Sequence, residues 1–171
     1  MMEYRRVYQP GGTFFFTLVT YDRIKRFENP NNVSLLGNAF RYVLKNHPFK
    51  MIAYAILPDH LHVIWQLPEG DPDYSTRWRL VKSYVTRKIR DTGKENDVLW
   101  QKRYWEHTIR NQNDLDKHID YIHYNPVKHG LSENPASWEY SSFNTYYGGG
   151  EYPREWGIVE SKDMFTGVVG E

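Results

Sequence analysis

The sequence predicts an α+β fold in which helices pack on one face of an antiparallel β-sheet. Segments rich in β-branched and aromatic residues alternate with segments whose apolar residues recur at helical spacing. Two of the strand-like segments flank a tight turn, which predicts an antiparallel hairpin. The length of 171 residues fits one domain that buries its own core, so we expect a single folded unit.

The first half of the chain predicts a strand, a helix and the hairpin. Residues 13–20, TFFFTLVT, follow the turn signal QPGG and are predicted to form a buried strand. Asn31 or Asn32 is the predicted N-cap of a helix whose apolar face runs from Leu35 to Leu44 and which should stop near residues 46–48. The segments FKMIAYAIL and HLHVIWQL then flank the turn dipeptide PD, and together they predict the hairpin.

The second half of the chain predicts a basic helix, a short strand and a last helix. Apolar residues at helical spacing predict a helix over residues 76–90, with arginine and lysine beside the apolar stripe. The segment around residues 105–109 is predicted as a fourth strand, and Asn113 as the cap of the last helix. We expect that helix to end at the step from Asn125 to Pro126, because the residue before a proline disfavours helical geometry. The order β-α-β-β-α-β-α contains the split β-α-β pattern of a ferredoxin-like sheet.

The composition of the C-terminal segment predicts where the domain ends, and the hydropathy of the chain predicts its cellular location. Residues 1–150 are expected to form the domain, and residues 151–171 an irregular C-terminal tail that is polar and contains glycine. No apolar run has the length of a membrane span or the character of a signal peptide. The expectation is therefore a cytoplasmic protein that has no membrane partner.

Composition restricts the chemistry that the chain can carry. Cysteine is absent, which excludes disulfides, cysteine-based zinc sites and a thiol nucleophile, so any nucleophile is an oxygen or a water. The net charge is only +1, but aromatic residues make up 16% of the chain and many lie beside arginine or lysine, as in YRRVY, RWRLVKSY and QKRYW. Such interleaving suits stacking on bases together with pairing to phosphates. Aromatic residues that pack the core, with charges that face solvent, are the simpler explanation of composition alone.

Two histidines lie two residues apart at the start of the predicted third strand. Because side chains alternate along a strand, His60 and His62 project from the same face. Their imidazoles can therefore ligate one cation from a rigid platform that is open to solvent at one end. The alternative is a pair of partly exposed histidines that form hydrogen bonds with their neighbours.

The last predicted helix carries a second group of polar side chains. At about 100° per residue, Ile119 and Ile122 lie within about 40° of Leu115 and form an apolar stripe. The polar members of the adjoining face are Asp114, His118, Tyr121 and Asn125. If this helix crosses the sheet face that bears the two histidines, a phenol, a carboxamide and two imidazoles converge. Otherwise Tyr121 is an ordinary packing residue of an amphipathic helix.

Four longer motifs give the chain a family resemblance. They are LPDHLHVIWQLP, STRWRLVKS, WQKRYWEHTIRN and DYIHYNPVKHGL, in this order and spacing. On these motifs the chain, over roughly residues 5–146, resembles the REP-associated tyrosine transposases within the wider IS200/IS605-like group of HUH single-tyrosine enzymes. The resemblance implies a ferredoxin-like HUH endonuclease fold.

The resemblance also implies roles for individual residues. It implies a metal site at His60 and His62, on either side of Leu61, and a nucleophilic Tyr121. Asn125 stands where the wider group commonly has a glutamine one turn after the tyrosine, and it is the implied third metal ligand. The implied metal is Mg²⁺ or Mn²⁺, and the implied partner is single-stranded or hairpin DNA formed by repetitive extragenic palindromes. The oligomeric state is left open as monomer or homodimer.

The function predicted on this basis is metal-dependent cleavage and strand transfer of single-stranded DNA through a 5′-phosphotyrosine intermediate. A bound divalent cation polarises the scissile phosphate, and the covalent link conserves bond energy for strand transfer. Two other functions remain open. One is a non-catalytic ferredoxin-like module that binds nucleic acid, in which the histidines and Tyr121 are incidental. The other is a metal-dependent hydrolytic nuclease in which the histidine pair activates water.

Several basic residues are candidates for DNA contact. Arg79, Lys82 and Arg87 lie at about one-turn spacings beside the apolar stripe of their helix, where they can follow a phosphate backbone. A solvated charged face is the alternative. The further candidates are Arg5 and Arg6 beside Tyr4 and Tyr8, Arg103 beside Tyr104, and Lys128 and His129 after the tyrosine helix. Glu106 and His107 either serve the site or pair locally.

Overall fold

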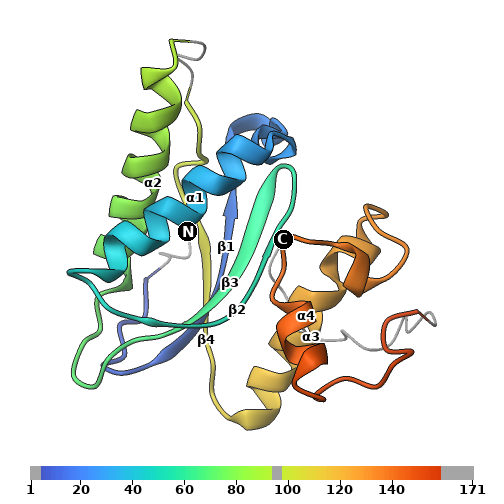
Figure 1. The fold of residues 1–171 in the computed structure, drawn as a ribbon. Coiled ribbons are helices and arrows are strands. Elements are labelled where there is room, and N and C mark those ends of the chain that lie inside the picture. Colours follow the sequence, from blue (N-terminus) through green and yellow to red (C-terminus); the bar gives the residue numbers. More distant parts are fainter. Residues whose placement is uncertain (1–4, 94–97, 159–171) are drawn as a thin grey trace.

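The computed structural model describes residues 5–93 and 98–158. Its centre is one four-stranded sheet with the strand order β2-β3-β1-β4, in which every neighbouring pair runs antiparallel. The strands are β1 (Thr13–Val19), β2 (Lys50–Ile56), β3 (His60–Gln66) and β4 (Trp105–Thr108) (Figure 1). This strand order with a β-α-β-β-α-β-α succession is ferredoxin-like, and it confirms the predicted α+β class.

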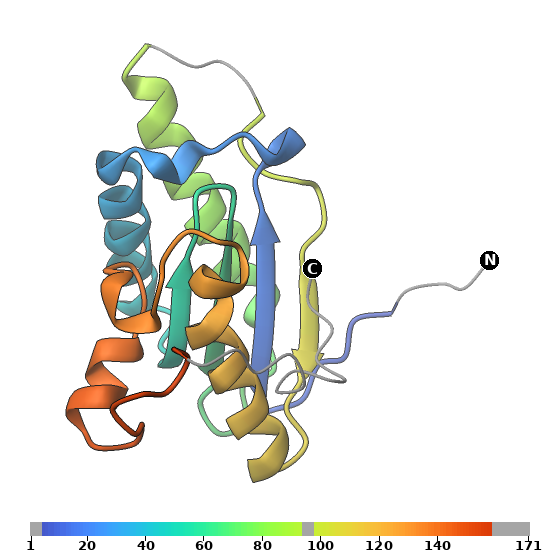
Figure 2. The same cartoon turned by 90° about the vertical axis from the view of Figure 1, so that its right-hand side faces the viewer.

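Helices cover both faces of the sheet. Helices α1 (Pro30–Leu44) and α2 (Tyr74–Asp91) lie on one face, and α3 (Gln112–Lys128) and the short α4 (Phe143–Gly148) lie on the other (Figures 1 and 2). Short 3-10 turns lie at Tyr21–Arg23, Arg26–Glu28 and Pro135–Ser137. The prediction that the helices pack on one face is therefore wrong.

The side chains of β1 explain why both faces are covered. They alternate, so Phe14 and Phe16 enter the core under α1 and α2, while Phe15 enters a second core under α3. A run of three phenylalanines is apolar on both sides of the strand, and burying it requires helices on both faces. The first core is centred on Trp65 of β3 and Trp78 of α2, whose ring centroids are 4.1 Å apart in a stacked arrangement.

Two helices begin earlier than predicted. Helix α1 is capped by Asn29 rather than by Asn31 or Asn32. Helix α3 is capped by Asn111 rather than by Asn113. In each helix the cap side chain accepts a hydrogen bond from a backbone N–H of the first turn. A proline occupies the first position of α1, where its missing N–H costs no helical hydrogen bond.

Helix α3 also ends later than predicted. It runs through Pro126 to Lys128, past the predicted end at Asn125. Proline has no N–H and therefore cannot donate to the carbonyl of Ile122, but the helix loses only that one hydrogen bond. The next turn closes because the N–H of His129 donates to the carbonyl of Asn125 at 3.1 Å.

The segment after α3 packs against β2 and the outer side of α3. The backbone N–H of Ser142 donates to the carbonyl of Tyr54 on β2. The rings of Tyr152 and Trp156 lie 5.0 Å and 5.8 Å from the ring of Phe143 on α4. Residues 159–171 of the expected tail lie outside the described residues, so the boundary at residue 150 stays a prediction. In the part of the chain that the structure describes, no helix combines the length and the apolar character that crossing a membrane requires.

Candidate active site

Two histidines stand side by side at the start of β3. The ring centroids of His60 and His62 are 5.0 Å apart, and both side chains are buried. Their strand neighbours Leu61 and Val63 enter the core under α1 and α2. The histidines therefore project from the opposite face, the face that α3 covers, as the alternation of the strand predicts.

A neighbouring side chain holds each imidazole through its Nδ1 atom. Thr17 Oγ1 lies 2.8 Å from Nδ1 of His62, and Asp59 Oδ1 lies 2.6 Å from Nδ1 of His60. Burial alone would raise the pKa of the Asp59 carboxyl, but its interactions with His60 and Arg23 outweigh burial and lower the pKa below its usual value. Partners of this kind orient metal-binding histidines, and because they engage Nδ1, Nε2 is the nitrogen that each ring could offer to a metal ion.

Tyr121 projects from α3 onto the histidine pair. Its ring centroid lies 5.4 Å from that of His62 in an edge-on arrangement, and only 3% of the residue is exposed. Lys128, two turns later, donates a hydrogen bond from Nζ to the phenolic oxygen at 3.4 Å. The ammonium also lies 4.9 Å from the centroid of the tyrosine ring. A cation in this position stabilises negative charge on the phenolic oxygen.

The polar face of α3 is the face that packs most deeply against the sheet. The buried polar residues of this face are Asp114, His118, Tyr121 and Asn125, whereas His123, also buried, packs against Ser142 and Tyr152 of the segment after α3. Leu115 and Ile119, which were predicted to form the buried apolar stripe, are only half-buried, although Ile122 is fully buried. The structure thus places the phenol of Tyr121 against His62, and buries Asn125 on the helix that covers the sheet face of the two imidazoles.

The donor set of this site fits a divalent cation. Two imidazole nitrogens and a carboxamide oxygen can come from His60, His62 and Asn125. Imidazole suits Mn²⁺ and later transition metals better than Mg²⁺, which prefers oxygen ligands. The ring of His129 lies 5.0 Å from that of His60 and adds another imidazole beside the pair. Sequence reasoning considered His129 only for phosphate contact, since its place at this site depends on the continuation of α3 past Pro126.

A second cluster of potential metal ligands lies at the start of α3. One ligand atom each from His107, Asp114 and His118 lies within 4.8 Å of the others. Nε2 of His107 donates a hydrogen bond to the carboxylate oxygen Oδ2 of Asp114 at 2.9 Å. Glu106, its neighbour on β4, pairs with Arg6 at 3.0 Å. Both residues therefore pair locally, which is one of the two roles considered for them.

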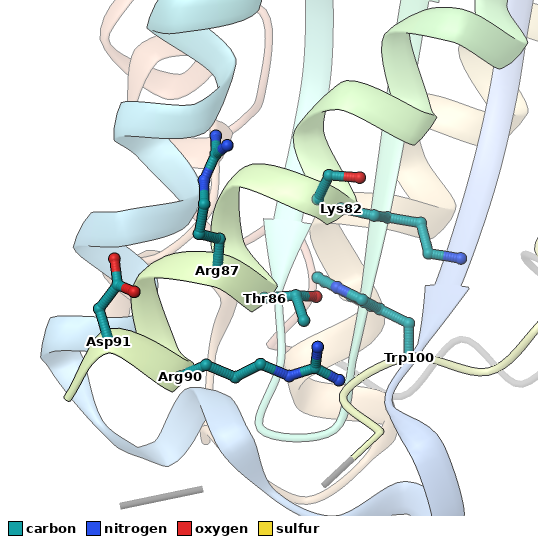
Figure 3. Close-up of a pocket in the computed structure, with 7 residues that line it drawn as sticks. Lys82, Thr86, Arg87, Arg90, Asp91 and Trp100 are labelled. Atoms are coloured by element: carbon teal, nitrogen blue, oxygen red, sulfur yellow. The ribbon is translucent and has the colours of Figure 1, made fainter. Parts of the chain in front are cut away.

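Two adjoining hollows form a basic groove along α2. Their volumes are about 350 Å³ and about 560 Å³, and Lys82 and Ser83 line both. The other lining residues are Arg6, Ser75, Arg79, Lys102 and Tyr104 in the smaller hollow and Thr86, Arg87, Arg90, Asp91 and Trp100 in the larger. In Figure 3 the Trp100 ring lies between the side chains of Lys82 and Arg90, whereas Arg87 points away from it. Burial, with a smaller contribution from Arg6, lowers the pKa of Lys82.

The structure divides the predicted DNA-binding cations into three sets. Those that line the basic groove are Arg6, Arg79, Lys82 and Arg87. Lys128 lies at Tyr121 instead. Arg5 and Arg103 are exposed and line neither hollow. Sequence reasoning missed Arg90, Lys102 and Trp100 as groove residues, because only the tertiary fold brings the segment around residue 100 against α2.

The chain is similar to known transposases along most of its length. The family Transposase IS200 like matches residues 12–125. A REP-associated tyrosine transposase of Escherichia coli (strain K12) is 42% identical over 156 residues, 91% of each protein. A protein of Haemophilus influenzae that is also named as a REP-associated tyrosine transposase is 40% identical over 167 residues, which cover 92% of this chain and 94% of that protein.

A solved structure extends this similarity to three dimensions. It is the structure of a REP-associated tyrosine transposase bound to a REP hairpin, and it matches with a TM-score of 0.83 and 39% sequence identity. The match covers 95% of this chain and 96% of that one. The chain therefore belongs to the IS200-like transposases and, within them, to the REP-associated tyrosine transposases, enzymes that cleave DNA and transfer strands.

Proposed function

We propose that Tyr121 is the nucleophile of this transposase, and that His60, His62 and Asn125 hold the divalent cation on which cleavage depends. The observation that carries the proposal is the 5.4 Å separation between the rings of Tyr121 and His62 on one buried face. All of these residues come from one chain, so a monomer can carry a complete site. The two imidazoles favour Mn²⁺ over Mg²⁺ as the ion.

The reaction is an in-line displacement at the scissile phosphate. The phenolic oxygen of Tyr121 forms a bond to phosphorus as the bond between phosphorus and the 3′ oxygen breaks. The phenol loses its proton to solvent, and the departing 3′ oxygen gains one, which leaves a 5′-phosphotyrosine and a free 3′-hydroxyl. A bound divalent cation polarises the phosphate. The phosphotyrosine keeps the energy of the broken bond, so a 3′-hydroxyl can attack it in strand transfer.

Lys128 supports the attacking oxygen. Its ammonium faces the phenolic oxygen at 3.4 Å, so it favours the negative charge that develops there as the proton leaves. The role proposed for Lys128 is therefore to stabilise the phenolate of Tyr121, in addition to any contact with a phosphate. A preorganised cation of this kind acts without moving during the reaction.

The substrate proposed for this chain is a DNA hairpin of the REP type, whose backbone follows the basic groove. The groove combines cations with two aromatic rings, Trp100 and Tyr104, which suits phosphates and unpaired bases together. Two backbone contacts connect the Trp100 end of the groove to the strand that carries the histidines. Trp100 forms a β-bridge with Thr20, and the N–H of Thr20 donates to the carbonyl of Asp59, next to His60.

A covalent-adduct assay tests the proposed function. The protein is incubated with Mn²⁺ and a single-stranded REP hairpin labelled at its 3′ end, and the product is separated under denaturing conditions. Label should remain with the protein and map to a peptide that contains residues 120–125. Tyr121→Phe should abolish cleavage and adduct together, while it keeps hairpin binding and loses only about 1 kcal/mol of stability.

Tyr124→Phe is the matched control, because it removes a phenol one turn away on the same helix. It should cleave and form the adduct as the wild-type protein does. Cleavage without an adduct would instead indicate a hydrolytic nuclease. Binding without cleavage at any Mn²⁺ or Mg²⁺ concentration would indicate a non-catalytic module.

A further inference from the structure

Away from the tyrosine, two histidines and one aspartate meet where β4 faces the start of α3. His107 belongs to β4, and Asp114 and His118 lie four residues apart on α3. One ligand atom from each lies within 4.8 Å of the other two. Within residues 5–93 and 98–158, no other three histidine, aspartate or glutamate side chains come this close together.

The three side chains already share hydrogen bonds. Nε2 of His107 lies 2.9 Å from Oδ2 of Asp114, and Nδ1 of His118 lies 3.2 Å from Oδ1 of the same carboxylate. Nδ1 of His118 also lies 2.7 Å from the backbone carbonyl of Asp114, to which it donates. The cluster therefore holds two imidazoles beside one anionic carboxylate, and Nε2 is the nitrogen that His118 can offer to a metal ion, because its Nδ1 donates to the helix backbone.

The protonation states of the buried members suit a cation. Burial lowers the pKa of His118, so its ring is neutral at neutral pH and offers the lone pair of Nε2, while Nδ1 carries the hydrogen. Burial alone would raise the pKa of the Asp114 carboxyl, but the N–H of Arg110 and the histidines lower it below its usual value. Neutral imidazole and ionised carboxylate are the forms that bind metal ions.

We propose that His107, Asp114 and His118 form a second divalent-cation site, which takes a borderline transition-metal ion such as Zn²⁺. Two imidazoles and one carboxylate are a common ligand set for such ions, and they leave a position for water. The ion fastens the edge strand β4 to the first turns of α3. It thereby helps to hold the helix that carries Tyr121 over the sheet.

The cluster must contract slightly to hold the ion. Ligand atoms at about 2.0–2.2 Å from Zn²⁺ stand roughly 3 to 3.5 Å apart from one another. His107 is the member that can move, because its side chain is 25% exposed, whereas those of Asp114 and His118 are 10% and 5% exposed. The two imidazoles now stack with an interplanar angle of 13°, so His107 must turn until a ring nitrogen points at the ion.

This site is separate from the proposed catalytic metal site. The ring of Phe15 lies between them, with its centroid 4.9 Å from the ring of His118 and 5.5 Å from that of His62. Two-metal catalytic centres hold their ions roughly 3.5–4 Å apart with shared ligands, and a phenyl ring in that space excludes such a centre. The role of the second ion is therefore to tie two elements together.

Metal stoichiometry tests the proposal without reference to cleavage. Equilibrium dialysis against Zn²⁺, with the bound metal measured by elemental analysis, is applied to the wild-type protein and to His60→Ala/His62→Ala. The wild-type protein should bind two ions per chain and the double variant one. Adding His107→Ala to the double variant should weaken the remaining site at least about ten-fold. His47→Ala, which removes a histidine outside both sites, should leave the stoichiometry unchanged.

Thermal unfolding provides the second measurement. Zn²⁺ should raise the Tm of His60→Ala/His62→Ala, because an ion that binds only the folded state stabilises it. The rise should vanish when His107→Ala is added, while circular dichroism without metal stays unchanged. The proposal is overturned if the double variant binds no ion, or if it binds Zn²⁺ equally well with and without His107. Neither result bears on whether Tyr121 forms an adduct.

Discussion

Nζ of Lys128 lies 3.4 Å from the phenolic oxygen of Tyr121 because both side chains stand on one face of an uninterrupted α3. The two residues are two helical turns apart, and Pro126 lies between them. If the helix ended at Asn125, as the proline predicts, Lys128 would not face the tyrosine. The continuation of the helix therefore supplies a cation to the proposed nucleophile.

Replacing Lys128 should slow cleavage more than it weakens DNA binding. Hydrogen bonds to charged groups contribute about 1.5–3 kcal/mol, which corresponds to a loss of roughly 10-fold to 100-fold in single-turnover rate for Lys128→Met. Lys128→Arg keeps the charge and should recover part of the rate. The defect should shrink as pH rises, since hydroxide then promotes loss of the phenolic proton. A defect that is independent of pH and matched by weaker hairpin binding would show that Lys128 contacts only phosphate.

Replacing Thr17 should change the metal requirement and leave the fold intact. Thr17→Val has the same shape but lacks the hydroxyl that holds Nδ1 of His62 at 2.8 Å. The Mn²⁺ concentration for half-maximal cleavage should rise about 10-fold to 100-fold. Thr17→Ser should restore it, and Thr13→Val, at the other end of β1, is the matched control. An unchanged Mn²⁺ requirement in Thr17→Val would remove His62 from the metal site.

The basic groove should determine how hairpin binding depends on salt. Each phosphate contact that is lost lowers the slope of log Kd against log salt concentration by about 0.9, so Arg79→Ala/Lys82→Ala should lower it by about two. Lys88→Ala, on the same helix but outside the groove lining, should leave the slope unchanged. Titrations by fluorescence anisotropy at several salt concentrations measure this. Equal slopes for the double variant and the wild type would make the groove a solvated surface.

Acid should destabilise the protein through His123. This ring is fully buried, with Nδ1 2.8 Å from Tyr152 Oη and Nε2 2.7 Å from Ser142 Oγ, and burial lowers its pKa from 6.5 to about 3. Between these values the unfolded chain binds more protons than the folded chain. The free energy of unfolding therefore falls as pH drops from about 6.5 toward 3, by at most about 1.4 kcal/mol per pH unit.

His123→Gln isolates this contribution, because glutamine can form hydrogen bonds but does not titrate. In urea unfolding, the wild-type protein should lose about 2 kcal/mol more than the variant between pH 7 and pH 5. Other groups with shifted pKa values, such as His118, are present in both proteins and cancel in the difference. A variant that loses as much stability as the wild type over this range would contradict the assignment.

Local periodicity predicted the order of the elements and the shared face of His60 and His62, because both depend on residues close together in the chain. It did not reveal the side of the sheet on which each helix lies, since the apolar run of β1 requires both faces to be covered but does not indicate which helix covers which face. Periodicity also could not predict the contact between Thr17 and His62, because it depends on the register between two strands that are far apart in sequence. The same holds for His107, which meets Asp114 and His118 only after β4 pairs with β1.

The pairing of Thr17 with His62 also means that the proposed site forms only when the strands have paired in the correct register. A slip of one residue between β1 and β3 would exchange the two faces of β1, turning the Thr17 hydroxyl away from His62 and Phe15 out of its core. Helix α3 is made after all four strands and must dock before Tyr121 meets the histidines. With Tyr121 as the proposed nucleophile, a chain in which α3 has not yet docked should therefore be unable to cut DNA, and the capacity to break a strand should arise only when that helix packs on the sheet.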